Sequence, residues 1–317
     1  MAQLNPALLA DKPEILELLA LLDAKDSAAI AQRDGLLRQL IPKIKPYPIE
    51  QLSLDVQDVG YQARDGYQLV SRLYWPTELP HDHQSIVLYI HGGGLISGTV
   101  DAADQSARDF ASLAKAPVLS LDYRLAPQNN ASDDLVQDVF SGLQWTVEQA
   151  EHLGLDVDRI QLVGVSAGGC LAAGIIPLAQ AHNIAINQLM LIYPMLDDAT
   201  INEQPDLVGL TTWTPQMNRQ GWQSLLKDHL GDVTLPSTVV PMHTQNYAIF
   251  PTTYIEVGDC DIFASEDQQF AANLKQAGVS TELHVYAGLP HAFESFGAAA
   301  YLPAIYQNRS TWLLKNK

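Results

Sequence analysis

The sequence predicts an α/β protein built on a doubly wound, mostly parallel β-sheet, and three observations support this. From residue 85 onward, short apolar runs typical of buried strands alternate with longer stretches of helical periodicity. Polar or glycine-rich segments follow directly after several of these runs. The 317 residues are 47% hydrophobic and 17% charged, so the chain can bury a large core. Right-handed crossovers are expected between the parallel strands.

The N-terminal segment of the chain is predicted to be helical. Residues 1–41 show helical periodicity, and Asp11 and Glu14 have the spacing of a capping box. The apolar positions of residues 4–22 cover a wider face than a solvated helix needs, so this face must pack on another part of the chain or cover it. A second helix is predicted over residues 26–40.

A proline-rich stretch at residues 42–48 follows as a stiff connector. We take it as the boundary between an N-terminal helical cap segment, residues 1–48, and the main domain, residues 49–317. Within the main domain, residues 197–249 are long for one crossover between strands. This stretch is a candidate for a second cap or lid segment.

The main domain begins with a predicted hairpin, after which strands and helices alternate. Alternating apolar residues at 52–56, a turn at Asp65-Gly66 and a strand at 67–74 predict the hairpin. The strands predicted after it are 85–90, 117–121, 160–163, 188–193, 252–257 and 281–286. The helices predicted between and after them are 102–115, 132–152, one from 167 that is kinked or ended at Pro177, 215–230, 265–277 and one after Phe293.

One serine lies in a turn with a distinctive pattern. Residues 164–168 read Gly-Val-Ser-Ala-Gly between a buried strand and a helix of small residues, which is the pattern of a nucleophile elbow. The two glycines avoid the collisions that bulkier residues would make at such a strained turn. By itself the pattern also fits an ordinary strand-to-helix turn. A phosphate-cradling turn is a further alternative, although no glycine-rich phosphate motif accompanies it.

Candidate functional residues follow the strands directly, because ligands of an open parallel sheet bind beyond the carboxyl ends of its strands. Ser166 follows one strand, a His-Gly-Gly-Gly run at residues 91–94 follows another, and His291 follows the last by a short loop. The acid that follows the strand before the last is one of three residues: Asp259, Asp261 and Asp267. The chain order of serine, acid and histidine is that of the α/β hydrolases.

These residue types have complementary roles in acyl transfer. Ser166 would be the nucleophile once a base takes its proton, and His291 can be that base near neutral pH. Asp261 would orient the imidazole and stabilise its protonated form. Backbone amides of the glycine loop at 92–94 and of Ala167 would bind the oxyanion. The glycine run by itself also fits a plain tight loop, and its histidine is expected to brace the loop.

Charge, cysteines and hydropathy exclude several other classes of protein. The formal net charge of −18, from 36 acidic and 18 basic residues, argues against binding to nucleic acid and against binding to an anionic membrane surface. Cys170 and Cys260 make no disulfide framework, and no apolar stretch is long enough to span a bilayer. The N-terminus lacks the pattern of a signal peptide, and no metal-site spacing occurs. We therefore expect a cytoplasmic protein without a metal.

Several motifs together make the chain resemble the hormone-sensitive-lipase-like family of α/β-hydrolase esterases over roughly residues 50–310. Besides the elbow and the glycine loop, four stretches carry the resemblance: Asp-Tyr-Arg-Leu-Ala-Pro at 122–127, Tyr-Pro-Met-Leu-Asp-Asp at 193–198, Tyr-Ile-Glu-Val-Gly at 254–258 and Pro-His-Ala-Phe at 290–293. The resemblance implies the α/β-hydrolase fold, with a mostly parallel central sheet of about eight strands, helices on both faces and a helical cap.

The resemblance also implies an activity and the residues that perform it. It implies a carboxylesterase that acts on short- to medium-chain acyl esters and needs no cofactor. Its partner would be the small-molecule ester, with no nucleic acid and no integral membrane segment, and a homodimer is one option for its assembly. The implied catalytic residues are Ser166, Asp261 and His291. The implied oxyanion donors are the amides of Gly93, Gly94 and Ala167.

Four residues, in three places, depart from the family pattern. Val165 precedes the serine where an acid is common, Gln128 follows the Arg-Leu-Ala-Pro run where Glu is usual, and Ala264-Ser265 stand where Arg-Asp is frequent. These departures bear on the acyl pocket and the substrate more than on the chemistry. The same triad could also act on amides, lactones or peptides, and a non-catalytic small-molecule-binding protein on this fold is an alternative of another class.

Overall fold

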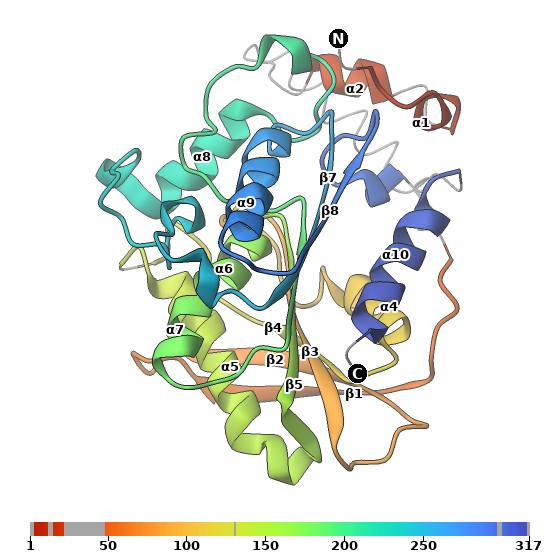
Figure 1. The fold of residues 1–317 in the computed structure, drawn as a ribbon, viewed down its shortest axis with the longest axis vertical. Helices are drawn as coiled ribbons and strands as arrows, with labels where there is room; N and C mark the ends of the chain where they lie inside the picture. The colour runs from red at the N-terminus through yellow and green to blue at the C-terminus, as the bar shows by residue number, and fades with distance from the viewer. Residues whose placement is uncertain (1–2, 12–14, 22–47, 130, 297–299, 316–317) are drawn as a thin grey trace.

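The computed structural model describes residues 3–11, 15–21, 48–129, 131–296 and 300–315 (Figure 1). The helix predicted over residues 26–40 and most of the proline-rich connector lie outside these residues.

An eight-stranded sheet runs through the centre of the described part of the chain, in the order β1-β2-β4-β3-β5-β6-β7-β8. The strands are β1 (Leu54–Gln62), β2 (Gln68–Pro76), β3 (Gln84–Ile90), β4 (Val118–Leu121), β5 (Leu155–Val165), β6 (Gln188–Ile192), β7 (Thr252–Gly258) and β8 (Thr281–Tyr286). β2 pairs antiparallel with β1 and with β4, and all the other pairs are parallel. The prediction of a mostly parallel sheet in an α/β fold is therefore confirmed.

Helices cover both faces of the sheet (Figure 1). α4 (Asp104–Ala114) and α10 (Leu302–Leu314) pack together on one face. The opposite face carries α5 (Asp134–Leu153), α6 (Ala167–Gly174), α7 (Ile176–Ala181) and α9 (Ala264–Gln276). The break between α6 and α7 falls at Ile175, and Pro177 stands in the first turn of α7, where its missing N–H leaves no helical hydrogen bond unmade. Short 3-10 turns complete the elements: η2 (Pro205–Leu207), η3 (Lys227–His229), η4 (Pro241–His243), η5 (Tyr247–Ile249) and η6 (Phe293–Phe296).

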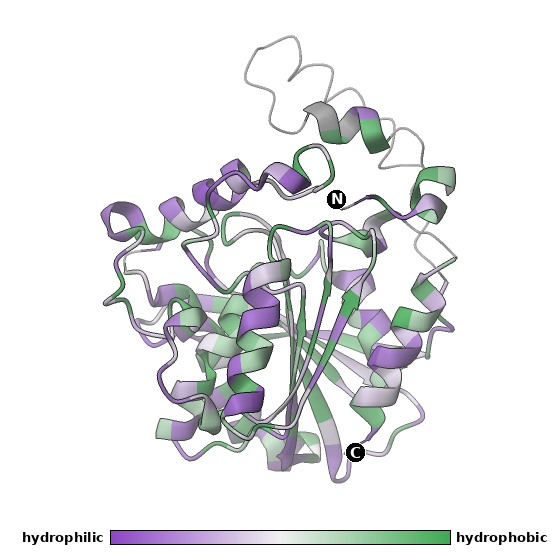
Figure 2. Ribbon diagram, turned by 45° about the horizontal axis from the view of Figure 1, so that its top comes forward, coloured by the Kyte–Doolittle hydropathy of each residue, from purple (hydrophilic) through white to green (hydrophobic). Residues whose placement is uncertain are grey.

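Strand β3 explains why the core has two layers. Its apolar run is buried almost throughout, and successive side chains point to opposite faces of the sheet. Leu88 packs in the apolar cluster under α5, α6 and α9, whereas Val87 and Tyr89 pack in the cluster under α4 and α10. Figure 2 shows the hydrophobic colour gathered in the central strands. The continuous apolar pattern of the sequence therefore reflects burial on both faces.

Strand β5 is longer than the 160–163 predicted. It begins at Leu155, which pairs with Gln84, and a register shift on β3 separates this pair from the regular ladder that starts at Ile160. The early part carries charged and exposed residues, so it lacks the apolar run on which the prediction depended. β5 ends at Val165, one residue before the serine of the elbow.

The N-terminal helices lie beyond the carboxyl ends of β7 and β8 (Figure 1). They are α1 (Pro6–Asp11) and α2 (Ile15–Leu21), so the apolar face predicted across residues 4–22 is divided between two helices. Asp11 is the last residue of α1, which corrects its predicted role at the start of a helix. Leu8 and Ile15 are buried in a small cluster with Cys260, and Met217 packs against it. The wide apolar face thus covers the rim of the sheet, as its width predicted.

Part of residues 197–249 also lies over this rim, whereas the part with η4 and η5 packs against α6, α7 and α9 (Figure 1). These residues contain α8 (Pro215–Leu226). Thr214 caps the start of this helix, because its side chain accepts a hydrogen bond from Met217 N. The helix predicted over 215–230 ends earlier, at Leu226, and η3 follows it. Gly221 of α8 lies against the glycine loop, because a Cβ there would be 2.4 Å from the Gly94 carbonyl oxygen. This packing places the segment beside the predicted site.

Candidate active site

The turn that carries Ser166 is held in a strained conformation. Ser166 has φ 55° and ψ −119°, and it stands between β5 and α6. A non-glycine residue adopts a positive φ only where the surrounding structure holds it there. Here Ser166 N donates to Ile192 O at 2.9 Å, and Met195 N donates to Ser166 O at 3.1 Å. The serine hydroxyl is therefore presented at the end of the central strands.

The glycines on either side of the serine are required by close packing. A Cβ on Gly168 would lie 2.1 Å from Ile90 O, and one on Gly164 would lie 2.5 Å from Gly168 O. Helix α6 thus approaches β3 and β5 more closely than any side chain allows. The sequence pattern of the elbow has its physical cause in these two contacts.

Three side chains from the ends of β5, β7 and β8 form one hydrogen-bonded chain. His291 Nε2 lies 2.9 Å from Ser166 Oγ, and His291 Nδ1 lies 2.6 Å from Asp261 Oδ2. Asp261 is 0% exposed, and Ser166 and His291 are 7% and 6% exposed. The arrangement can therefore take a proton from the serine with little competition from water.

The structure distinguishes the three candidate acids. Asp261 contacts the histidine, as just described. Asp259 instead accepts a hydrogen bond from Gly288 N at 2.6 Å and so supports the loop before His291. Asp267 lies in the first turn of α9 with a fully buried side chain. Burial, together with the nearby Glu266 and Asp261 carboxyls, raises the pKa of Asp267 well above its ordinary value.

Aromatic side chains fix the plane of the His291 ring. Tyr193 and Phe263 meet it edge-on, with ring centroids at 4.6 Å and 5.2 Å. The Tyr193 hydroxyl donates to Glu294 Oε2 at 2.7 Å. Tyr193 has a φ of 35°, so its backbone also holds an unusual conformation beside the site. Thr212 Oγ1 donates to His291 O from the segment above the rim.

The glycine loop lies directly against the elbow. A Cβ on Gly92 would lie 3.1 Å from the Cβ of Ser166. Gly93 and Gly94 have φ values of +127° and +61°, which side-chain-bearing residues rarely adopt. Ala167 is the next residue after Ser166 and opens α6. The three predicted amide donors therefore all belong to segments that adjoin the serine.

His91 braces this loop, as the sequence predicted. Its Nδ1 lies 2.8 Å from Gly92 O, and its ring stacks on Tyr123 with centroids 4.3 Å apart. The Tyr123 hydroxyl donates to His91 O at 2.8 Å. Burial lowers the pKa of His91, so the ring is neutral near pH 7. Tyr123 explains part of the motif at 122–127, to which sequence reasoning had assigned no role.

Sequence reasoning also missed Trp213. A Cβ on Gly94 would lie 2.4 Å from Trp213 Cη2, so the indole covers that glycine. The Trp213 ring lies 6.2 Å from the His291 ring. No spacing or motif marks this residue; only its place in the long 197–249 segment could have drawn attention to it.

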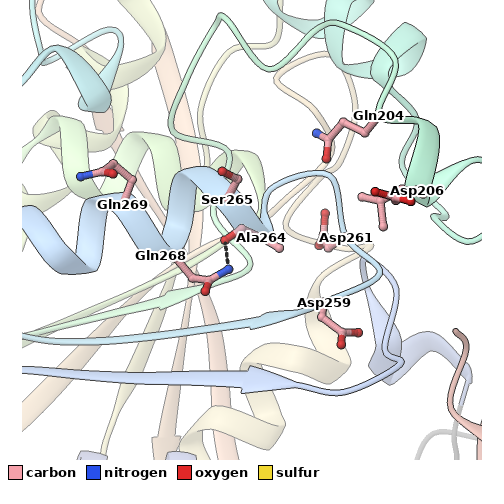
Figure 3. A pocket seen from close by; sticks show the side chains of 9 residues that line it. Gln204, Asp206, Asp259, Asp261, Ala264, Ser265, Gln268 and Gln269 are labelled. Atoms are coloured by element: carbon pink, nitrogen blue, oxygen red, sulfur yellow. Dashed lines mark hydrogen bonds between the residues drawn. The ribbon is translucent and has the colours of Figure 1, made fainter. Parts of the chain in front are cut away.

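A polar cavity of about 600 Å³ adjoins the other side of Asp261 (Figure 3). It is lined by Gln204, Asp206, Leu207, Asp259, Asp261, Ala264, Ser265, Gln268 and Gln269. In Figure 3 the two glutamines of α9 lie along one side, and Gln268 donates to Ala264 O at 2.8 Å. The lining includes neither the serine nor the histidine of the triad, so the cavity lies behind the site. Among the described residues, no group of three or more His, Cys, Asp or Glu side chains is arranged to hold a metal.

Comparison with known proteins agrees with the fold. A family model described as alpha/beta hydrolase fold matches residues 87–295. Ethyl acetate hydrolase of Pseudomonas putida is 32% identical over 256 residues, 77% of each chain. Esterase LipI of Mycobacterium tuberculosis is 30% identical over 280 residues, 86% of this chain and 84% of its own. The solved structure of a bacterial heroin esterase superposes with a TM-score of 0.80 at 25% identity, covering 98% of this chain and 97% of that one.

A central, mostly parallel sheet with a serine elbow at its edge defines the class of α/β hydrolases. The chain belongs to this alpha/beta hydrolase fold family, in its hormone-sensitive-lipase-like branch. It is a hydrolase of the carboxylesterase and lipase class. Within the described part of the chain, no helix is both long and apolar enough to cross a membrane.

Proposed function

We propose that the protein is a serine carboxylesterase that hydrolyses short- to medium-chain acyl esters through an acyl-enzyme. The observation that carries the proposal is the hydrogen-bonded chain from Ser166 through His291 to the buried Asp261. The names of the two curated relatives, an ethyl acetate hydrolase and an esterase, support the ester as the substrate.

In the first half-reaction, Ser166 Oγ attacks the ester carbonyl carbon while His291 Nε2 takes the hydroxyl proton. Asp261 accepts the hydrogen bond from Nδ1–H and stabilises the imidazolium that forms. The amides of Gly93, Gly94 and Ala167 bind the oxyanion. The tetrahedral intermediate then collapses, the imidazolium protonates the leaving oxygen, and the alcohol departs from the acyl-enzyme.

In the second half-reaction, a water molecule gives a proton to His291 Nε2 and attacks the acyl carbonyl. The same amides bind the second oxyanion. Collapse breaks the bond to Ser166 Oγ, the proton returns to that oxygen, and a carboxylic acid is released. The neutral imidazole is needed twice in the cycle, once in each half-reaction.

Hydrolysis of nitrophenyl esters from acetyl to dodecanoyl tests the proposal. We expect Ser166→Ala to lower kcat by roughly 10⁴- to 10⁶-fold for every ester, because the nucleophile is lost. Ser265→Ala, at an exposed serine on α9, serves as the matched control and should keep full activity. Activity of Ser166→Ala close to that of the unaltered protein would overturn the mechanism.

Amides with the same acyl groups, measured in parallel, test the ester as the preferred substrate. The same triad chemistry can hydrolyse amides and lactones, because the serine attacks a carbonyl carbon in each of them. We expect kcat/KM to be far higher for the ester. An amide that is hydrolysed faster than the matched ester would contradict the proposed substrate class.

A further inference from the structure

The indole of Trp213 lies against Gly94 of the glycine loop and close to the His291 ring. A Cβ added to Gly94 would lie 2.4 Å from Trp213 Cη2 and 2.6 Å from Cζ2, so the far edge of the ring rests on the glycine loop. The same ring lies 6.2 Å from His291, centroid to centroid. An ester whose carbonyl oxygen meets the loop while its leaving oxygen meets His291 must therefore extend past this indole.

Hydrogen bonds hold the indole in this position. Trp213 Nε1 donates to Asn218 Oδ1 at 3.2 Å, and Thr211 Oγ1 donates to Trp213 O at 2.8 Å. Asn218 is 0% exposed, and its Nδ2 donates to Thr200 O at 2.6 Å. If the ring turned away, it would leave the buried Asn218 oxygen without its donor, which is costly. The indole is thus a fixed wall of the site.

The backbone that carries the wall is fastened on both sides of the site. The neighbouring Thr212 donates through Oγ1 to His291 O. In α8, the close contact of Gly221 with Gly94 O joins the same segment to the glycine loop. The wall therefore keeps its distance from the serine unless one of these contacts breaks.

We propose that Trp213 is a specificity-determining residue that limits the substrates to short- and medium-chain esters, by blocking the path of longer chains between the glycine loop and His291. This proposal rests on the proposed function, since it concerns the same site. Trp213 takes no part in the chemistry. Its role is steric, so its replacement changes which esters fit and leaves the triad intact.

Two substrate series measure the effect: nitrophenyl esters of acids from acetyl to dodecanoyl, and acetates of alcohols from ethyl to octyl. We expect Trp213→Ala to raise kcat/KM for the long members, relative to the shortest, by at least about tenfold in one series or both. Trp213→Phe should give a smaller shift in the same direction. The kcat for the shortest ester should stay within about tenfold of that of the unaltered protein. A change of about this size is what the loss of a single methylene contact produces.

Trp145→Phe is the matched control, because Trp145 belongs to α5, stacks on Tyr61 and lies outside the site. It should leave both chain-length profiles unchanged. Thermal unfolding curves show whether each variant is folded, and Trp213→Phe decides the matter if Trp213→Ala does not fold. Unchanged profiles in both series for a folded Trp213 variant would overturn this inference. The proposed function would fail separately, by activity that survives Ser166→Ala.

Discussion

The carboxyl of Asp267 takes no part in the hydrogen-bonded chain at the serine, yet it is fully buried. Among the described residues, neither of its oxygens has a hydrogen-bond partner. Its neighbour Glu266 accepts from Leu196 N at 2.6 Å with one oxygen only. Burial raises the pKa of both carboxyls well above their ordinary values. Both groups therefore bind a proton more strongly in the folded chain than in the unfolded chain.

A raised pKa in the folded state links stability to pH. Its contribution is fully present below the ordinary pKa of an aspartic acid and is lost as pH rises through the folded value. We expect Asp267→Asn to be more stable than the unaltered protein at pH 8, by on the order of 1–2 kcal/mol, with a smaller gain at pH 5. Urea unfolding at the two pH values measures the difference. The exposed Asp228→Asn is the control, and a gain that is equal at both pH values would contradict the prediction.

A second residue whose role can be tested alone is His91. His91→Phe keeps the stacking on Tyr123 but removes the hydrogen bond to Gly92 O. Because the glycine loop would then hold its amides less firmly, we expect kcat to fall by about 10- to 100-fold, less than the loss of an oxyanion donor itself. KM should change little. A variant with normal kcat would show that the loop needs no brace, and loss of folding, checked by circular dichroism, would be a separate result.

Among the elements, α10 is attached to the sheet through a buried charge. Arg309 of α10 is 3% exposed, and its Nε donates to Glu256 Oε1 of β7 at 2.9 Å. It also pairs with Glu294, which in turn accepts from the Tyr193 hydroxyl. Because Tyr193 contacts the His291 ring, the attachment of this helix reaches the site through one residue.

We expect Arg309→Met to lower the free energy of unfolding by about 3–5 kcal/mol, because Glu256 would be left buried without its partner. Adding Glu256→Gln should recover part of the loss, since the charge is then removed as well. Arg64→Met is the matched control. Arg64 forms an exposed pair with Asp133, and such pairs contribute at most about 1 kcal/mol. Equal losses for the buried and the exposed arginine, measured by urea unfolding, would contradict this account.

Local patterns predicted the elements with two kinds of error. The strands and helices that carry continuous apolar runs, such as β3, were predicted closely because burial itself produces the pattern. The charged first half of β5 was missed because its partner is a register-shifted end of β3, which the local sequence does not contain. The N-terminal apolar face was predicted to pack, but its division into α1 and α2 was not.

In the candidate site too, local sequence patterns predicted some residues and not others. The serine and histidine follow from their strand-end positions, whereas position alone left three acids, and Asp261 was chosen among them through the family resemblance. In the structure Asp261 lies 2.6 Å from His291. Trp213 could not be predicted, because its contact with Gly94 joins residues more than a hundred positions apart and no motif carries it. The boundary at residue 48, the cytoplasmic location and the homodimer remain predictions from the sequence.

For the whole molecule, the site depends on one sheet that joins distant parts of the chain. The glycine loop, the serine, the acid and the histidine follow β3, β5, β7 and β8 in that order. We expect loss of esterase activity and change of tryptophan fluorescence to follow one curve in urea, because the candidate site residues follow four strands of the same sheet. Activity that disappears well before the fluorescence changes would show that the β7–β8 edge opens on its own.

The position of His291 after the last strand has a consequence for the newly made chain. During synthesis the serine elbow emerges more than a hundred residues before the histidine. Under the proposed mechanism, a chain that is released or stalled before β8 has docked would hold the nucleophile without its base, and it would not hydrolyse esters. The measured activity would then report the fraction of chains in which β8 has joined the sheet.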